Sequence, residues 1–148
     1  MKLDRGNRHS PAAGLSPAFD WTAAVLLVVI AGLHVAAFPV HVEEAVYIGT
    51  LFLLYAGASV VLAAGVIWRR PVASPLAAVL TTAAVVLYVV ARTSGLPDYR
   101  EDSWTDPVGA FPVGLLSLVL EGVFLLLYVV QARPTRRPGA TQRQLSAG

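Results

Sequence analysis

The sequence predicts an all-α fold, specifically a polytopic membrane four-helix bundle. Hydrophobic residues make up 56% of the 148 residues and charged residues only 14%, whereas soluble domains average about 25% charged residues. The apolar residues gather in four blocks, each of a length that can cross a bilayer. All Lys and Arg residues lie outside these blocks. Together these observations indicate a small membrane protein with a single domain.

The four blocks define the expected helices in order. They cover residues 21–40, 45–68, 75–91 and 111–130, and a spanning helix needs about 20 mostly apolar residues. None of them has the wide charged face that a helix of a soluble bundle presents to water. We therefore expect helices at about 21–40, 44–68, 74–92 and 110–131, within a transmembrane domain of residues 20–132.

Residue types typical of helix ends flank the blocks. Asp20 precedes the first block as a candidate N-cap, and Ser74 precedes a proline at the expected first position of the third helix. Gly95 can end the third helix in a left-handed cap. Prolines mark the remaining boundaries, at Pro71, Pro97, Pro107 and Pro112.

The distribution of charge predicts the orientation. Nine of the eleven Lys and Arg residues lie in the two tails or between the second and third blocks. Because cytoplasmic segments carry such an excess, we expect a multi-pass cell-membrane protein with both termini in the cytoplasm. The opposite side is acidic and carries Glu43, Glu44, Asp98, Glu101, Asp102 and Asp106.

The two tails, residues 1–19 and 133–148, are polar and contain Pro, Gly and Ser. We expect both tails to be cytoplasmic and disordered, the C-terminal one being basic. Their positive charges flank membrane segments, where orientation and anionic headgroups account for them. We therefore expect the lipid bilayer as a partner, with a membrane protein or a second copy as a further possible partner, and no nucleic acid.

Ionisable side chains in or beside the spanning blocks are costly and need a partner or a function. Glu121 lies about 15 Å deep in the fourth helix and His34 about 8 Å deep in the first, at 1.5 Å per residue. Glu44 and Arg92 lie at the membrane edge on the same acidic side. We expect these four groups to form a polar cluster, or a ligand-binding site, in the extracytoplasmic half of the bundle.

Helical spacing and depth suggest neighbours for these groups. Tyr55 on the second helix and Thr81 or Thr82 on the third match the depth of Glu121, about 15 Å. Three other polar residues match the depth of His34 better: Tyr47, Tyr88 and Ser117. The supporting residues that we expect around the cluster are thus Tyr47, Tyr55, Tyr88 and Ser117.

A purely structural interpretation competes with a functional one at each position. Glu121 can be a protonated carboxyl group bonded to a Tyr or Thr, and His34 a neutral imidazole bonded across helices. Arg92 can form a simple ion pair at the rim with Glu43 or Glu44. These alternatives stay open at the level of the sequence.

Few side chains in this sequence are suited to binding a metal ion. There is no Cys, which excludes disulfides and thiolate metal sites. A mixed nitrogen and oxygen site, of the kind that suits zinc, copper(II) or iron, would draw on His34, His41, Glu43 and Glu44. These residues have no diagnostic spacing, so the sequence specifies no cofactor. The zincin, nucleophile-elbow and P-loop motifs are absent, and we expect no enzymatic activity.

Four segments carry a resemblance to a known group of proteins. They are Leu33-His34, residues 41–54 (HVEEAVYIGTLFLL), residues 91–109 (ARTSGLPDYREDSWTDPVG) and residues 115–124 (LLSLVLEGVF). In this order they resemble uncharacterised small four-helix integral membrane proteins of high-GC Gram-positive bacteria. The resemblance implies the four-helix architecture and no particular activity. The segments include the same ionisable residues that their cost singled out: His34, Glu44, Arg92 and Glu121.

Three classes of function follow from these observations. The first is a structural or accessory membrane component in which the polar cluster fixes helix register. The second is a module that binds a metal or small ligand and is associated with membrane redox chemistry. The third is a proton or ion transport element that uses Glu121 and His34.

Overall fold

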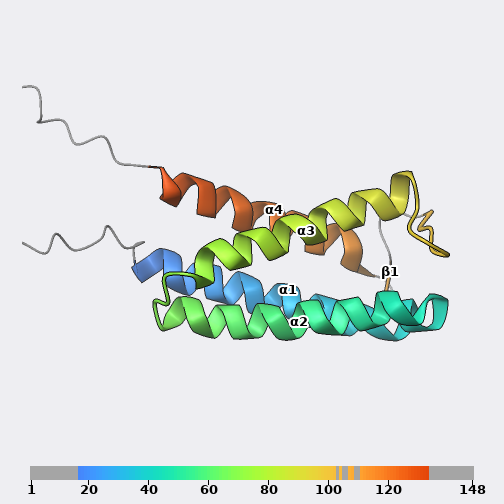
Figure 1. The fold of residues 1–148 in the computed structure, drawn as a ribbon, viewed down its shortest axis with the longest axis horizontal. Helices are drawn as coiled ribbons and strands as arrows, with labels where there is room; N and C mark the ends of the chain where they lie inside the picture. The colour runs from blue at the N-terminus through green and yellow to red at the C-terminus, as the bar shows by residue number, and fades with distance from the viewer. Residues whose placement is uncertain (1–16, 103, 105–106, 109–110, 134–148) are drawn as a thin grey trace, which may run out of the picture.

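The described part of the chain consists almost entirely of four long helices (Figure 1). The computed structural model describes residues 17–102, 104, 107–108 and 111–133. Its helices are α1 (Pro17–Glu44), α2 (Val46–Ile67), α3 (Ala73–Thr93) and α4 (Val113–Ala132). All four are long and apolar enough to cross a membrane. The predicted all-α, four-helix fold is thus confirmed.

The helix ends differ from the predicted ones by a few residues. α1 begins at Pro17, so the end of the expected N-terminal tail is helical, and Asp20 lies in the first turn instead of capping the helix. α1 also continues through Pro39, and the backbone N–H of Ala45 closes its last turn on the carbonyl of His41. The expected disorder of residues 1–16 and 134–148 concerns segments outside the described residues.

α4 begins later than expected, at Val113. The two residues before it form β2 (Phe111–Pro112), which pairs antiparallel with β1 (Pro107–Val108). This short ladder holds the residues before Val113 in extended backbone, which the apolar composition of the segment did not reveal.

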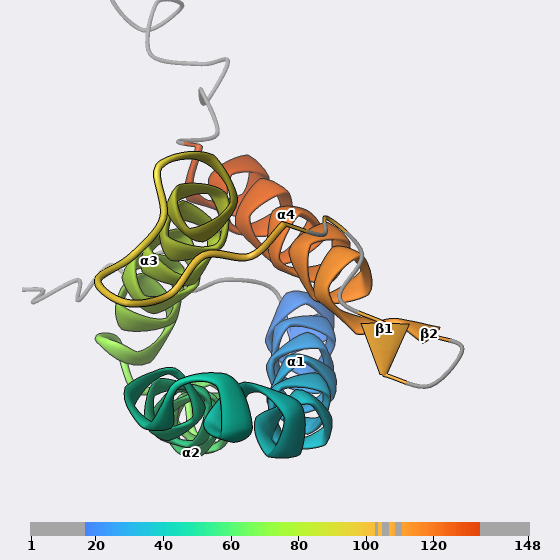
Figure 2. The same ribbon diagram turned by 90° about the vertical axis from the view of Figure 1, so that its right-hand side faces the viewer.

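The helices are arranged in a ring in chain order. α1 packs against α2 and α4, and α3 packs against the same two helices. A view along the bundle shows the four helices around a common centre (Figure 2). Side chains of all four helices can therefore meet at that centre.

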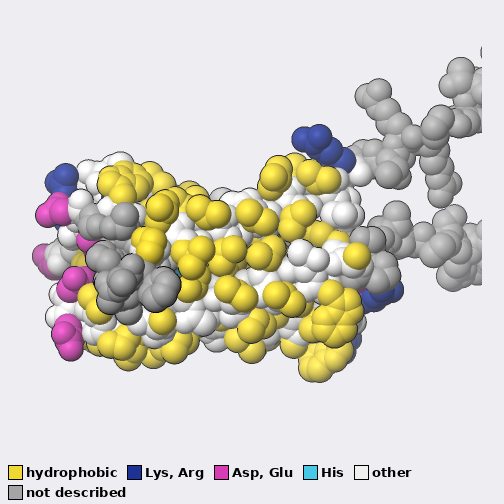
Figure 3. Space-filling model, turned by 180° about the vertical axis from the view of Figure 1, so that it is seen from behind, with side chains coloured by type: hydrophobic (Ala, Val, Ile, Leu, Met, Phe, Trp, Pro, Cys, Tyr) yellow, Lys and Arg dark blue, Asp and Glu magenta, His cyan; other side chains and the backbone are white. Residues whose placement is uncertain are grey.

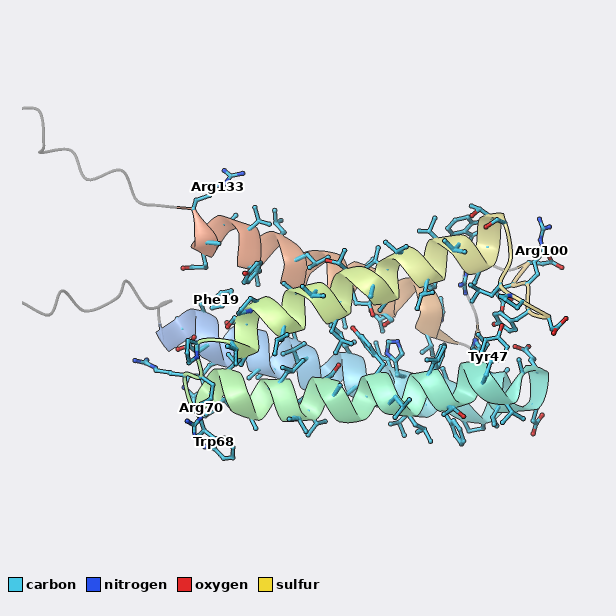
Figure 4. The ribbon with its side chains drawn as sticks, viewed as in Figure 1. Phe19, Tyr47, Trp68, Arg70, Arg100 and Arg133 are labelled. Atoms are coloured by element: carbon cyan, nitrogen blue, oxygen red, sulfur yellow. The ribbon has the colours of Figure 1, made fainter. Side chains whose placement is uncertain are left out.

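Charged residues collect at the two ends of the ring (Figure 3). Arg70 and Arg133 lie at one end, and Arg100 and Tyr47 at the other (Figure 4). We call the first the basic end; it also holds Arg69. We call the other the acidic end, which holds Glu43, Glu44, Asp98, Glu101 and Asp102. Exposed Val and Leu side chains cover the helices between the two ends, as the surface of a protein in lipid requires.

The half of the bundle near the basic end is tightly packed. Its core contains Leu27 of α1, Val66 of α2 and Phe124 of α4, each at most 2% exposed. Small residues on α3, chiefly Ala73 and Ala77, allow the neighbouring helices to approach closely. The half near the acidic end is built differently, and it contains the candidate site.

Candidate functional site

A buried carboxyl group lies at the middle of the bundle. Glu121 of α4 is 3% exposed. Its Oε1 accepts a hydrogen bond of 3.2 Å from the hydroxyl of Tyr55 on α2. The same oxygen accepts a bond of 3.4 Å from Ser117, one turn earlier on α4. These two donors replace part of the hydration that the carboxyl group loses on burial.

α1 contributes His34 to the same group. Its Nδ1 lies 2.9 Å from the carbonyl oxygen of Ile30. A carbonyl can only accept, so Nδ1 carries the hydrogen and Nε2 faces Glu121, 3.9 Å from Oε1. The imidazole ring also packs on Tyr55, with ring centroids 4.4 Å apart. His34 is therefore fixed in orientation by its own helix and by α2.

Two further hydroxyl groups complete a polar layer. Ser59 of α2 and Thr81 of α3 are both 0% exposed, and neither hydroxyl has a hydrogen-bond partner among the described residues. Both hydroxyl groups lie near the hydroxyl of Tyr55. Ser59 was not among the residues expected from the sequence, although its position one turn after Tyr55 places it on the same helix face. We call this layer the polar cluster: His34, Tyr55, Ser59, Thr81, Ser117 and Glu121.

A cavity of about 500 Å³ extends from the polar cluster toward the acidic end. Its walls are mostly apolar side chains from all four helices, such as Leu33, Ile48 and Leu80. Glu121 and His34 lie at its inner end, and Arg92 lies near its outer end. The cavity is thus apolar along its length and polar at both ends.

The cavity reaches the surface of the bundle between α2 and α3. Leu54 of α2 and Leu87 of α3 both line it, yet they are 64% and 43% exposed. Figure 1 shows α3 diverging from α2 toward the acidic end. In a membrane this side opening would face the acyl chains.

Arg92 and Tyr88 form a pair near the outer end of the cavity. The Arg92 guanidinium carbon lies 3.6 Å from the centre of the Tyr88 ring, a cation–π arrangement. The Tyr88 hydroxyl donates a bond of 2.6 Å to the carbonyl of Trp104. Among the described residues, Arg92 makes no ion pair with Glu43 or Glu44.

Four of the residues expected in or around the cluster lie outside it, and Arg92 and Tyr88 are two of them. The Tyr47 hydroxyl donates a bond of 2.5 Å to the carbonyl of Pro97, so it fastens α2 to the segment after α3. Glu44 is exposed at the end of α1. The structure therefore brings His34, Tyr55 and Ser117 to Glu121. The expected residues that it leaves outside the polar cluster are Glu44, Tyr47, Tyr88 and Arg92.

The structure also does not bring the four expected metal ligands together at one site. His34 belongs to the polar cluster, and Glu43 is exposed. His41 and Glu44 instead form a group with Glu101, a residue that the sequence analysis placed only on the acidic side. Their ligand atoms all lie within 4.8 Å of one another.

Comparisons with protein-family models, with curated proteins and with solved structures find no match for this chain.

Proposed function

We propose that the chain is a membrane-embedded binding module for a small lipid-soluble ligand with a hydrogen-bonding headgroup. The observation that carries the proposal is the cavity of about 500 Å³ that ends on Glu121 and His34. Ligand pockets typically have volumes of about 300–1,000 Å³, with apolar walls and a few convergent polar groups. This cavity has each of these properties.

The polar cluster indicates what kind of headgroup fits. Glu121 Oε2 and His34 Nε2 make no hydrogen bond among the described residues, so both are available to a ligand. Aromatic rings surround this end of the cavity: His34 packs on Phe52 and Tyr55 at 5.1 and 4.4 Å. A ring that carries carbonyl or hydroxyl groups, as in a quinone or a phenol, satisfies both conditions.

The opening between α2 and α3 suits the other part of such a ligand. The side chains beside it, Leu54 and Leu87, are apolar and exposed. An apolar tail can pass between them into the acyl chains while the headgroup stays on Glu121. The ligand would then enter from the bilayer, without crossing an aqueous phase.

The charge distribution supports the orientation in this proposal. Arg69, Arg70 and Arg133 lie at the basic end, and Lys and Arg are enriched in cytoplasmic loops. We therefore place the basic end, with both termini, in the cytoplasm of a cell that carries the chain in its cell membrane. The cavity then lies in the outer leaflet.

The other two classes of function receive less support. A proton or ion path would have to continue from Glu121 to the basic end, where the core consists of apolar side chains such as Leu27 and Phe124. A structural or accessory role accounts for the polar cluster but leaves the cavity without a purpose. It predicts a co-purifying membrane partner and no bound ligand.

Thermal unfolding of the purified chain in detergent tests the proposal, with decylubiquinone as the probe. A ligand that binds only the folded state stabilises it by about 2.7 kcal/mol at 100 times its Kd, so we expect the probe to raise Tm. Decylbenzene, which has the same tail but no hydrogen-bonding group, should have little effect. Glu121→Gln should weaken the response to the quinone.

Two α3 variants give a matched control. Ala84 lines the cavity, whereas Val86 is exposed and does not. Ala84→Phe should fill the cavity and abolish the shift in Tm, and Val86→Phe should keep it. An equal shift in both variants would mean that the probe acts through the detergent, and this result would overturn the proposal. So would the absence of any shift in the unaltered chain.

A further inference from the structure

We propose that His41, Glu44 and Glu101 form a binding site for a divalent transition-metal ion at the acidic end of the bundle. This site is separate from the polar cluster, and the inference does not depend on the proposed ligand of the cavity. It joins the end of α1 to the segment that follows α3, which lie far apart in the sequence.

The separation of the three residues suits one ion. Their ligand atoms lie within 4.8 Å of one another. With metal–ligand bonds of about 2.0–2.2 Å, the ligand atoms of a tetrahedral zinc ion lie about 3.3–3.6 Å apart. The three side chains would therefore have to move together by about 1 Å to bind one ion, and Glu44 is exposed and has room to move.

His41 has the properties of a metal-binding histidine. It is 4% exposed, and its Nδ1 lies 2.9 Å from the carbonyl oxygen of Ala37. The carbonyl fixes the hydrogen on Nδ1, which leaves the lone pair on Nε2. Metal-binding histidines typically donate their other N–H to a carbonyl or carboxylate in this way. Among the described residues Nε2 makes no hydrogen bond, although the side chain is almost fully buried.

Glu101 is held toward the site by its surroundings. Its Oε2 accepts a bond of 2.9 Å from the Tyr99 hydroxyl, and its backbone N–H donates to the carbonyl of Ala91 at 3.2 Å.

The ligand set indicates the class of ion. One imidazole nitrogen and two carboxylates suit zinc, iron(II) or manganese better than magnesium or calcium, which prefer oxygen alone. Three protein ligands leave one tetrahedral position for water. The neighbouring carboxylates at the acidic end raise the local concentration of cations.

An ion at this site would also affect the cavity. His41 and Tyr99 both line its outer end, and their ring centroids lie 6.3 Å apart. Binding would fasten the segment that contains Tyr99 to α1. The outer end of the cavity would then be more rigid when metal is bound.

Calorimetric titration with Zn²⁺ tests the inference. The sample is the whole chain in detergent, without a histidine tag, after a chelator has removed any metal ions. We expect one ion per chain, and Co²⁺ in its place should give the visible absorption of a tetrahedral site. Substitution of a residue that hydrogen-bonds to a metal ligand typically weakens metal affinity about 10–100-fold. His41→Gln and Glu101→Gln each remove a direct ligand, so each should weaken zinc affinity by at least that factor. Glu101→Gln keeps an acceptor for Tyr99 and so preserves the fold.

Neighbouring residues provide the controls. Glu43→Gln removes the same charge as Glu44→Gln from the adjacent position, outside the group, and should leave zinc affinity unchanged. Asp98→Asn should also leave it unchanged. Equal losses in Glu43→Gln and Glu44→Gln would show general attraction to an acidic surface and overturn the inference. So would unchanged affinity in Glu101→Gln.

Discussion

At the scale of single residues, the surroundings of Glu121 explain how a carboxyl group is kept within an apolar bundle. Tyr55 and Ser117 both donate to the same oxygen, at 3.2 and 3.4 Å. Such bonds contribute little net stability, but a buried donor that loses its acceptor costs about 1–3 kcal/mol. The hydroxyl of Tyr55 therefore depends on Glu121 as much as the carboxyl depends on it.

This dependence predicts the effects of two substitutions at Glu121. Glu121→Leu removes the acceptor for both hydroxyls and should lower the free energy of unfolding by about 1–3 kcal/mol. Glu121→Gln keeps an acceptor and should cost less. Denaturant unfolding in detergent, followed by circular dichroism, measures both changes. Full tolerance of Glu121→Leu would contradict the central position of the carboxyl group in the polar cluster.

A double substitution separates the hydrogen bond from other effects of the leucine. Tyr55→Phe removes the donor, so the cost of Glu121→Leu should be smaller in that background. Residues in direct contact show coupling of about 0.5–3 kcal/mol, whereas distant pairs add independently. Additive costs would mean that the bond between Tyr55 and Glu121 contributes nothing.

The sequence predicted only some of the neighbours of these residues. Helical spacing and depth placed Tyr55 and Ser117 near Glu121, because periodicity holds along a helix. Tyr47 and Tyr88 were misplaced, because their hydroxyls reach carbonyls of the segment between α3 and α4. Glu101 lies in that same segment, where no periodic rule specifies the direction of a side chain.

At the scale of the elements, the corner between α1 and α2 is unusually tight. One residue, Ala45, separates the two helices. Val42 of α1 lies directly against Gly49 of α2, where a Cβ would come within 2.6 Å of the Val42 Cβ and 2.8 Å of its Cα. Gly49 is thus required by the close approach of the two helices.

Two glycines of α2 give a matched prediction. Gly49→Ala must displace backbone, and overpacking of this kind costs about 1–3 kcal/mol. At Gly57 a Cβ would meet nothing within 4 Å, so Gly57→Ala should be neutral or stabilising by up to about 1 kcal/mol through helix propensity. Thermal unfolding in detergent compares the two. Equal stability of both variants would contradict the close contact at the corner.

The helices themselves could be predicted from the sequence, but their exact ends could not. Four apolar blocks of spanning length leave few alternatives to four helices. The ends depend on tertiary contacts: Asp20 pairs with Arg69 at 3.2 Å, so the first turn of α1 is fastened to the turn after α2. An N-cap assignment for Asp20 considers only its local sequence and therefore overlooks this contact.

At the scale of the whole molecule, two asymmetries run along the same axis. One end is basic and the other acidic (Figure 3), and the packed core lies toward the basic end while the cavity lies toward the acidic end. The distribution of Lys and Arg along the sequence predicted the asymmetry of charge. The asymmetry of packing depends on how α3 diverges from α2, which the sequence pattern does not specify. Because the cavity lies toward one end only, the orientation in the membrane decides which leaflet would supply the proposed ligand.

Cysteine labelling tests this orientation directly, because the chain has no cysteine of its own. Arg70 and Arg100 are exposed at opposite ends (Figure 4). If the excess of basic residues places the basic end in the cytoplasm, a membrane-impermeant maleimide should label Arg100→Cys in intact cells. It should label Arg70→Cys only after permeabilisation, and labelling of both variants after permeabilisation shows that each thiol is accessible. The reverse pattern would place the acidic end inside the cell. The cavity would then open to the cytoplasmic leaflet, and the metal site would meet the low free-metal concentrations of the cytoplasm.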